Sequence, residues 1–81
     1  MHYVYILIDA KRNIYIGRTS DLKRRIKEHN LQKVYTTKRM QNPILYYYEA
    51  YFNELFAKER ERKLKQFGSS YVGLIKRIGL K

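Results

Sequence analysis

Three short stretches of the chain are rich in β-branched and aromatic residues, which favour extended structure. They are residues 3–9, 13–17 and 44–51. In residues 3–9 the positions on both alternating faces are apolar, so we expect this strand to be covered on both sides. Only a short polar segment around residues 10–12 separates it from the second stretch, and so short a connection predicts an antiparallel hairpin.

Elsewhere the apolar positions recur at helical spacing. We expect a first helix over about residues 21–30, with Ser20 as its N-cap and Asp21 in its first turn, where a carboxylate favours the helix dipole. A second helix is expected over residues 54–67, with Asn53 as its cap, and it ends at Gly68. Its predicted buried stripe consists of Phe56, Ala57, Leu64 and Phe67.

A last helix follows Ser69 or Ser70, either of which can cap it, and it ends near Gly79. Its apolar residues are Tyr71, Val72, Leu74, Ile75 and Ile78. The predicted order is therefore β-β-α-β-α-α. This pattern predicts one α+β domain over residues 1–81, in which helices flank a small three-stranded antiparallel sheet, since a chain this short supports a single small core.

The composition of the chain narrows the classes of function and partner that fit it. The chain has 18 Lys and Arg residues against seven Asp and Glu residues, a formal net charge of +11, which favours a polyanion as partner over a merely solvated surface. Nine tyrosines among these charges favour nucleic acid in particular. Because cysteine is absent, disulfides and thiolate zinc sites are excluded. No apolar run approaches the ~20 residues of a membrane span, and no signal peptide is evident, so we expect a soluble cytoplasmic protein without a membrane partner.

Several side chains that could take part in binding or catalysis lie at the junction between the second strand and the first helix. Gly17 allows the chain to turn after Tyr15. At roughly 100° per residue, Arg25 and His29 lie beside the apolar side of the first helix, whereas Arg24 lies on the opposite side. If one arginine works in a site under this helix, we expect it to be Arg25.

Each of these groups has a use in phosphoryl transfer. A phenol, at Tyr5 or Tyr15, is a general base at neutral pH only if cations such as Arg18 or Arg25 depress its pKa. The guanidinium of Arg25 offers paired donors to phosphate oxygens. His29 can hydrogen-bond the phosphate or the attacking water, or shuttle a proton. The alternatives are ordinary packing for the tyrosines, a surface charge for Arg25 and a satisfied helix-terminal histidine for His29.

Carboxylates that could hold a divalent cation are few. The candidates are Glu49 in the third strand and Glu54, Glu59 and Glu61 in the second helix. Helical angles favour Glu61 only slightly, and an ion pair within the helix, such as Glu59 with Lys63, is an equal alternative for any one of them. Without a clustered pair, a two-metal site is not expected.

Residues 31–43 are basic and contain the only proline, which predicts an exposed loop. With the lysines of the first helix, this loop is expected to hold a nucleic-acid backbone without reading its sequence. The predicted nucleic-acid contacts are Lys23, Lys27, Lys33, Thr37, Lys38 and Arg39.

The motifs Tyr3-Val4-Tyr5 and Tyr15-Ile16-Gly17, followed by Arg25 and His29, resemble the GIY-YIG nuclease superfamily over essentially the whole chain. The likeness is greatest to small single-domain bacterial members, relatives of the N-terminal nuclease of the DNA excision-repair incision subunit. Each motif alone is weak, but the ten-residue step from Tyr15 to Arg25 makes their combination specific.

This resemblance implies roles for individual residues. Tyr5 and Tyr15 match the two motif tyrosines, one of which orients or deprotonates the attacking water. Arg25 matches the phosphate-binding arginine, His29 the position held by His or Tyr, and Glu61 the single ligand of one Mg²⁺ or Mn²⁺ ion. The chain departs from the family in having Tyr3 in place of the first glycine. It also has Arg18 in place of the repair nuclease's lysine, and an arginine can stabilise a phenolate but cannot relay a proton.

The leading hypothesis is thus a metal-dependent endonuclease acting on DNA, with structure-selective or weakly sequence-specific cleavage, because so small a domain has little surface for reading bases. The main alternative is a non-catalytic or partner-dependent module of the same fold that binds nucleic acid. A scaffold protein would explain the charge poorly. RNA as the substrate, a protein partner for targeting and the oligomeric state are left open by the sequence.

Overall fold

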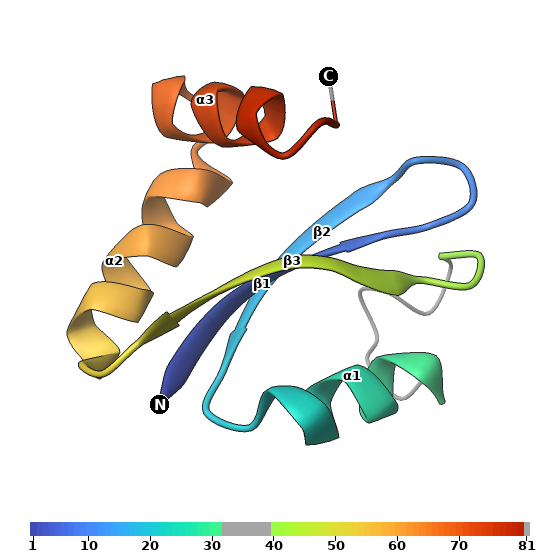
Figure 1. Cartoon of the computed structure of the whole chain (residues 1–81), viewed down its shortest axis with the longest axis horizontal. Helices are drawn as coiled ribbons and strands as arrows, with labels where there is room; N and C mark the ends of the chain where they lie inside the picture. Colours follow the sequence, from blue (N-terminus) through green and yellow to red (C-terminus); the bar gives the residue numbers. More distant parts are fainter. Residues whose placement is uncertain (32–39, 81) are drawn as a thin grey trace.

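The computed structural model describes residues 1–31 and 40–80, and within them the chain forms six elements (Figure 1). In chain order they are β1 (His2–Ile8), β2 (Ile14–Thr19), α1 (Leu22–Asn30), β3 (Ile44–Tyr51), α2 (Glu54–Lys65) and α3 (Ser69–Arg77). The strands form one antiparallel sheet in the order β2-β1-β3. The predicted fold class and element order are therefore confirmed.

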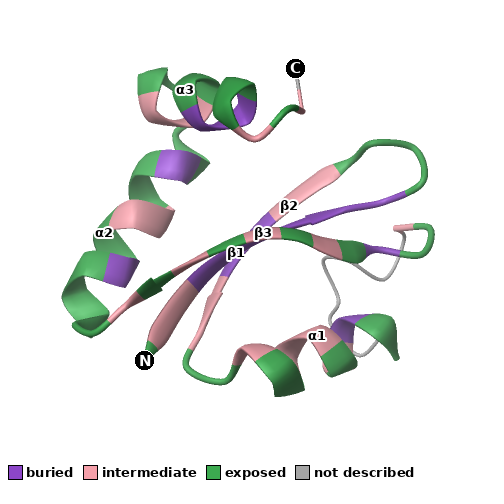
Figure 2. Cartoon of the chain, viewed as in Figure 1, coloured by how far each residue is buried: buried purple, intermediate pink, exposed green. Residues whose placement is uncertain are grey.

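The central strand β1 is buried from Val4 to Ile8, as its two apolar faces predicted (Figure 2). One face carries Val4 and Ile6, which pack with Ile16 of β2 against α2 and α3. The other face carries Tyr5, which contacts α1. Burial of each large side chain stabilises the fold by about 1.5–3 kcal/mol, so the two helical layers clamp β1 between them.

The buried carboxylate of Asp9 organises the turn between β1 and β2. It accepts hydrogen bonds from the backbone N–H groups of Lys11 and Asn13 and from the Asn13 side chain. It also accepts one from the N–H of Gln41, which leads into β3. Since Arg12 adopts a left-handed conformation with φ of 65° in this turn, the Asp9 bonds hold a conformation that the chain would not favour alone.

Strand β3 contains a register shift opposite Ile6 and Leu7, where Leu45 pairs with Leu7 and Tyr47 with Ile6. Tyr46 is the extra residue of this bulge, which breaks the alternation of side chains along the strand. The Tyr46 hydroxyl donates to the carbonyl of Ile78, at 2.9 Å, at the end of α3. The bulge thus fastens the C-terminal helix to the edge of the sheet.

The helix starts differ from the predictions at two of the three sites. Asp21, not Ser20, is the N-cap of α1, and its side chain accepts from the N–H of Arg24. The N–H of Asp21 in turn donates to the Thr19 hydroxyl, which fixes the turn leaving β2. Helix α3 has Gly68 as its N-cap and no side-chain cap, so neither serine serves. Asn53 caps α2 as predicted.

The end of α2 also departs from the prediction. The helix stops at Lys65, and Phe67 rather than Gly68 takes the left-handed conformation, with φ of 56°. Of the predicted stripe only Ala57 and Leu64 are buried, whereas Phe56 and Phe67 are exposed. In α3, Leu74 and Ile75 are buried as predicted, but Val72 is exposed. The narrow sheet leaves room for only a thin apolar seam on each helix.

Candidate active site

The α1 side of the sheet brings together three of the predicted site residues. The Tyr5 hydroxyl and Nε2 of His29 are 2.8 Å apart in a buried hydrogen bond. The Tyr15 ring lies 5.2 Å from the His29 ring and 6.2 Å from the Tyr5 ring, centroid to centroid. Tyr5 and His29 are buried while Tyr15 is half-buried, so Tyr15 is the phenol with access to solvent.

Gly17 makes this approach of the two phenols possible. It pairs with Tyr5 across β1 and β2. A Cβ atom at position 17 would lie 2.4 Å from the Tyr5 hydroxyl oxygen and 2.9 Å from Cε2 of Tyr15. Glycine is therefore required here because the Tyr5 ring occupies the space that any other side chain would fill.

Substitution Gly17→Ala should destabilise the fold by about 1–3 kcal/mol, because the buried Tyr5 ring cannot shift without disturbing the core. Gly73→Ala in α3 is the matched control, since nothing lies within 4 Å of a Cβ there and alanine favours a helix. Urea denaturation would measure both. A Gly17→Ala protein as stable as Gly73→Ala would contradict the tight contact.

Arg25 projects from α1 toward this cluster, as the helical angles predicted, and Arg24 is exposed. The Arg25 guanidinium also pairs with Glu28, with Nη1 of Arg25 and Oε1 of Glu28 3.1 Å apart. Burial raises the pKa of Tyr5 to about 12, and Arg25 opposes this rise without cancelling it. Tyr5 is thus a protonated phenol at neutral pH, which does not favour it as a general base, and its catalytic role stays a prediction. Burial and then Arg25 lower the pKa of His29, so it is neutral as well.

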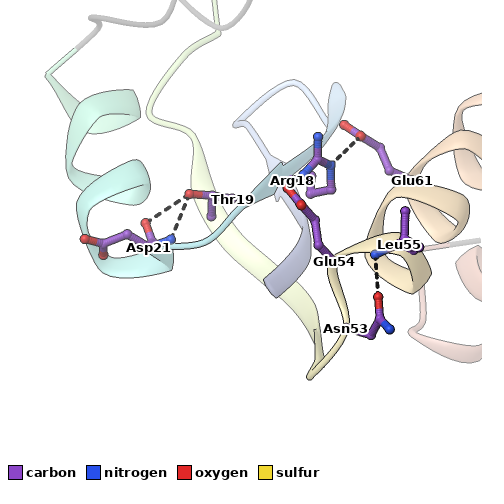
Figure 3. Close-up of polar contacts among 7 residues, drawn as sticks. All are labelled: Arg18, Thr19, Asp21, Asn53, Glu54, Leu55 and Glu61. Atoms are coloured by element: carbon purple, nitrogen blue, oxygen red, sulfur yellow. Dashed lines mark hydrogen bonds and ion pairs between the residues drawn. The ribbon is translucent and has the colours of Figure 1, made fainter. Parts of the chain in front are cut away.

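The opposite face of β2 carries a second group of charged residues (Figure 3). Nε of Arg18 lies 3.2 Å from Oε1 of Glu61, and its Nη1 lies 3.5 Å from Oε2 of Glu54. Nζ of Lys65 lies 3.0 Å from Oε2 of Glu61. Arg18 pairs with Val4 in the sheet, one position beyond Gly17, so its side chain points to α2 and away from the tyrosines. The expectation that it depresses a tyrosine pKa is therefore not supported.

The remaining carboxylate candidates are engaged elsewhere. Glu49 accepts hydrogen bonds from Tyr47, Tyr51 and Arg60, all at 2.6–2.9 Å. The exposed Glu59 pairs with Arg62, one residue from the predicted partner Lys63. In the helix it is Glu61 that makes the i,i+4 pair, with Lys65. Glu61 is therefore the one half-buried carboxylate of α2 that faces β2 and the second group of charges.

Within residues 1–31 and 40–80, no three His, Cys, Asp or Glu side chains gather to hold a metal ion. A single carboxylate still suits Mg²⁺, because this ion keeps several waters and takes further oxygens from substrate phosphates. Glu61, whose side chain is 20% exposed, fits that requirement once Arg18 and Lys65 release its oxygens. The arrangement is a one-carboxylate site on one side of β2 and a phenol–imidazole–guanidinium group on the other.

Comparison with known proteins identifies the family of the chain. The chain matches the GIY-YIG catalytic domain over residues 1–73. The chain belongs to the GIY-YIG family. It is 35% identical over 66 residues to a UPF0213 protein of Bacillus pumilus, a match that covers 82% of this chain and 63% of that relative. It is 33% identical over 67 residues to a UPF0213 protein of Haloquadratum walsbyi, covering 82% of this chain and 75% of the relative.

A UPF0213 protein of Clostridium perfringens is 37% identical over 67 residues, which cover 82% of this chain and 72% of that relative. The chain thus spans less than two thirds of the Bacillus pumilus relative and about three quarters of the other two. No solved structure shows significant similarity to it. In the part of the chain that the structure describes, no helix is both long enough and apolar enough to cross a membrane.

Of the nucleic-acid contacts predicted for this GIY-YIG chain, Lys23 and Lys27 are exposed on α1. The other predicted contacts, Lys33, Thr37, Lys38 and Arg39, lie outside the described residues. In the second group of charges, Lys65 was missed by sequence reasoning, whereas Glu54 was already among the carboxylate candidates. Glu54 and Lys65 lie seven before and four after Glu61, spacings that place all three on one side of a helix.

Proposed function

We propose that the chain is a divalent-metal-dependent endonuclease that hydrolyses phosphodiester bonds of DNA. The observation that supports this most is the placement of two complementary groups on either side of the edge strand β2. Tyr5, Tyr15, Arg25 and His29 gather on the α1 side. Glu61 lies on the α2 side. Membership of the GIY-YIG family supports the same reaction class.

In this proposal Tyr15 orients the attacking water, because it is the phenol of the pair with access to solvent. Tyr5 and His29, both neutral, hold each other and the Tyr15 ring in place. The water oxygen forms a new bond to phosphorus and gives up a proton to solvent, while the bond to the 3′ oxygen breaks and the leaving oxygen takes a proton from solvent.

Arg25 binds the phosphate oxygens, since a fixed guanidinium stabilises the charge that develops there. Glu61 holds the ion, Mg²⁺ or Mn²⁺, which supplies further charge stabilisation when bound. The net charge of +11 draws the DNA backbone to the domain irrespective of sequence. So small a surface favours recognition of DNA shape, and hence structure-selective cleavage.

One contact favours a second function, a module that binds nucleic acid without cutting it. Arg18 and Lys65 already occupy both oxygens of Glu61, so an ion must displace them before it binds. If neither DNA nor a protein partner releases this contact, the domain binds but does not cleave. The same assays distinguish the two functions.

The test is cleavage of labelled branched, flapped and linear DNA with Mg²⁺, Mn²⁺ or EDTA. We expect nicking that EDTA abolishes, and about a 100-fold loss in Arg25→Ala, the size typical of a lost charge-stabilising donor. Arg24→Ala is the matched control because this neighbouring arginine is exposed. If the protein binds these DNAs but cuts none of them, the proposal fails and the binding module is the better account.

A further inference from the structure

A groove of about 400 Å³ adjoins the candidate active site along the edge of β2. It is lined by Ile14, Tyr15, Ile16, Lys65 and Phe67. Two of these residues connect it to the proposed chemistry. Tyr15 belongs to the phenol–imidazole group, and Lys65 pairs with Glu61 at 3.0 Å. The groove therefore adjoins both groups of residues in the proposed site.

Phe67 is the unusual member of this groove. It adopts φ of 56°, a left-handed conformation that is a genuine outlier for a bulky side chain. The next residue is Gly68, which would take this conformation at little cost but does not. Core burial does not explain the strain, since Phe67 is 61% exposed. Strained residues cluster at ligand sites, where the strain positions a side chain.

A ring on α3 supports Phe67 in this position. The Tyr71 ring packs against it edge-on, with centroids 4.8 Å apart and planes at 77°. An exposed aromatic ring held by a neighbour is suited to stacking, because a nucleobase offers a flat face to such a ring. The apolar wall formed by Ile14 and Ile16 suits the base, and the ammonium of Lys65 suits its phosphate.

We propose that this groove binds an unpaired nucleobase of DNA, stacked on Phe67, with the phosphate of that nucleotide beside Lys65. The base must be unpaired because bases inside a duplex are already stacked on both faces. The position of the groove relative to the cleaved bond rests on the proposed function, but the stacking itself does not. Such a site would select DNA with a single strand leaving a duplex, such as a flap.

The test compares binding of two flapped DNAs in EDTA by fluorescence anisotropy, one intact and one with abasic sites in the single strand near the junction. Phe67→Asn removes the ring but suits the left-handed conformation. We expect it to weaken binding of the intact flap about tenfold, within the range for loss of one stacked base. The abasic flap should bind the variant and the wild type alike.

Phe52→Asn is the matched control, since Phe52 is 90% exposed and lies outside the groove, and it should leave both affinities unchanged. Phe67→Leu, which stays apolar but lacks a flat ring, should behave like Phe67→Asn, whereas Phe67→Trp should keep the preference for the intact flap. Equal weakening on both DNAs, or none, would overturn the proposal. Because EDTA removes cleavage from the measurement, this failure is separate from failure of the nuclease.

Discussion

Replacing Glu61 with glutamine is expected to lower DNA cleavage about 1,000-fold, because a metal ion contributes several kcal/mol of charge stabilisation to phosphoryl transfer. DNA binding should persist or tighten, since the change frees Arg18 and Lys65 to contact phosphates. Cleavage is measured under single-turnover conditions with Mg²⁺. Binding of Mn²⁺, followed by electron paramagnetic resonance with DNA present, should be lost in the variant.

Glu54→Gln is the matched control for this prediction. Glu54 lies on the same helix and also pairs with Arg18, but its side chain is 51% exposed and, at 3.5 Å, it is the more distant of the two carboxylates that pair with Arg18. We expect near-normal cleavage. If Glu54→Gln were as inactive as Glu61→Gln, the loss would reflect the disturbed Arg18 contact, and Glu61 would have no separate role as a metal ligand.

The largest effect on stability is expected for Glu49→Ala, which should reduce the free energy of unfolding by about 2–4 kcal/mol. Glu49 accepts both hydrogen bonds of the Arg60 guanidinium, each at 2.9 Å, and those of two tyrosine hydroxyls. Its removal leaves Arg60 largely buried without its counter-charge. Because total stability of small domains is only about 5–15 kcal/mol, thermal unfolding should shift clearly. This network also fixes α2, the helix that carries Glu61.

The same network predicts a dependence on pH. Although burial raises the pKa of Glu49, the bonds from Arg60 and the two tyrosines outweigh it, and the net pKa lies below the usual 4.5. A depressed carboxyl pKa contributes stability above its unfolded value that is lost as pH falls through the folded value. The wild type should therefore lose stability below about pH 4.5 more steeply than Glu49→Ala. Glu59→Ala, which breaks only the exposed pair with Arg62, should change little.

Periodicity predicted the elements of this fold well because each follows a clear local pattern. Strand β3 has the predicted bounds of residues 44–51, and the inward side of α1 was assigned to Arg25 over Arg24 correctly. The N-cap residues were harder to predict, since neighbouring residues of similar chemistry can each take the N-cap position. Asp21 prevails over Ser20 because the Thr19 hydroxyl fixes its backbone, a contact that depends on how β2 ends.

The electrostatics of the site was the less predictable part. Sequence proximity grouped Arg18 with the tyrosines, but alternation along β2 turns it to the other face, where residues 36 and 43 positions away meet it. The pKa of Tyr5 depends on a balance between burial and Arg25, and burial cannot be measured from the sequence. Phe67 was assigned to the core because helical periodicity does not reveal where α2 unwinds.

Tyr5 belongs both to the core and to the candidate site, and this limits the motion of the site around it. Its strand is paired on both sides, with Gly17 and with Tyr48, and its side chain is completely buried. Segments of this kind exchange their amide hydrogens only when the whole domain opens. The Tyr5–His29 contact therefore shares the lifetime of the folded state itself. If the proposed function holds, adaptation to differently shaped DNA comes instead from the periphery, where Phe67 and the ion pairs of Glu61 lie.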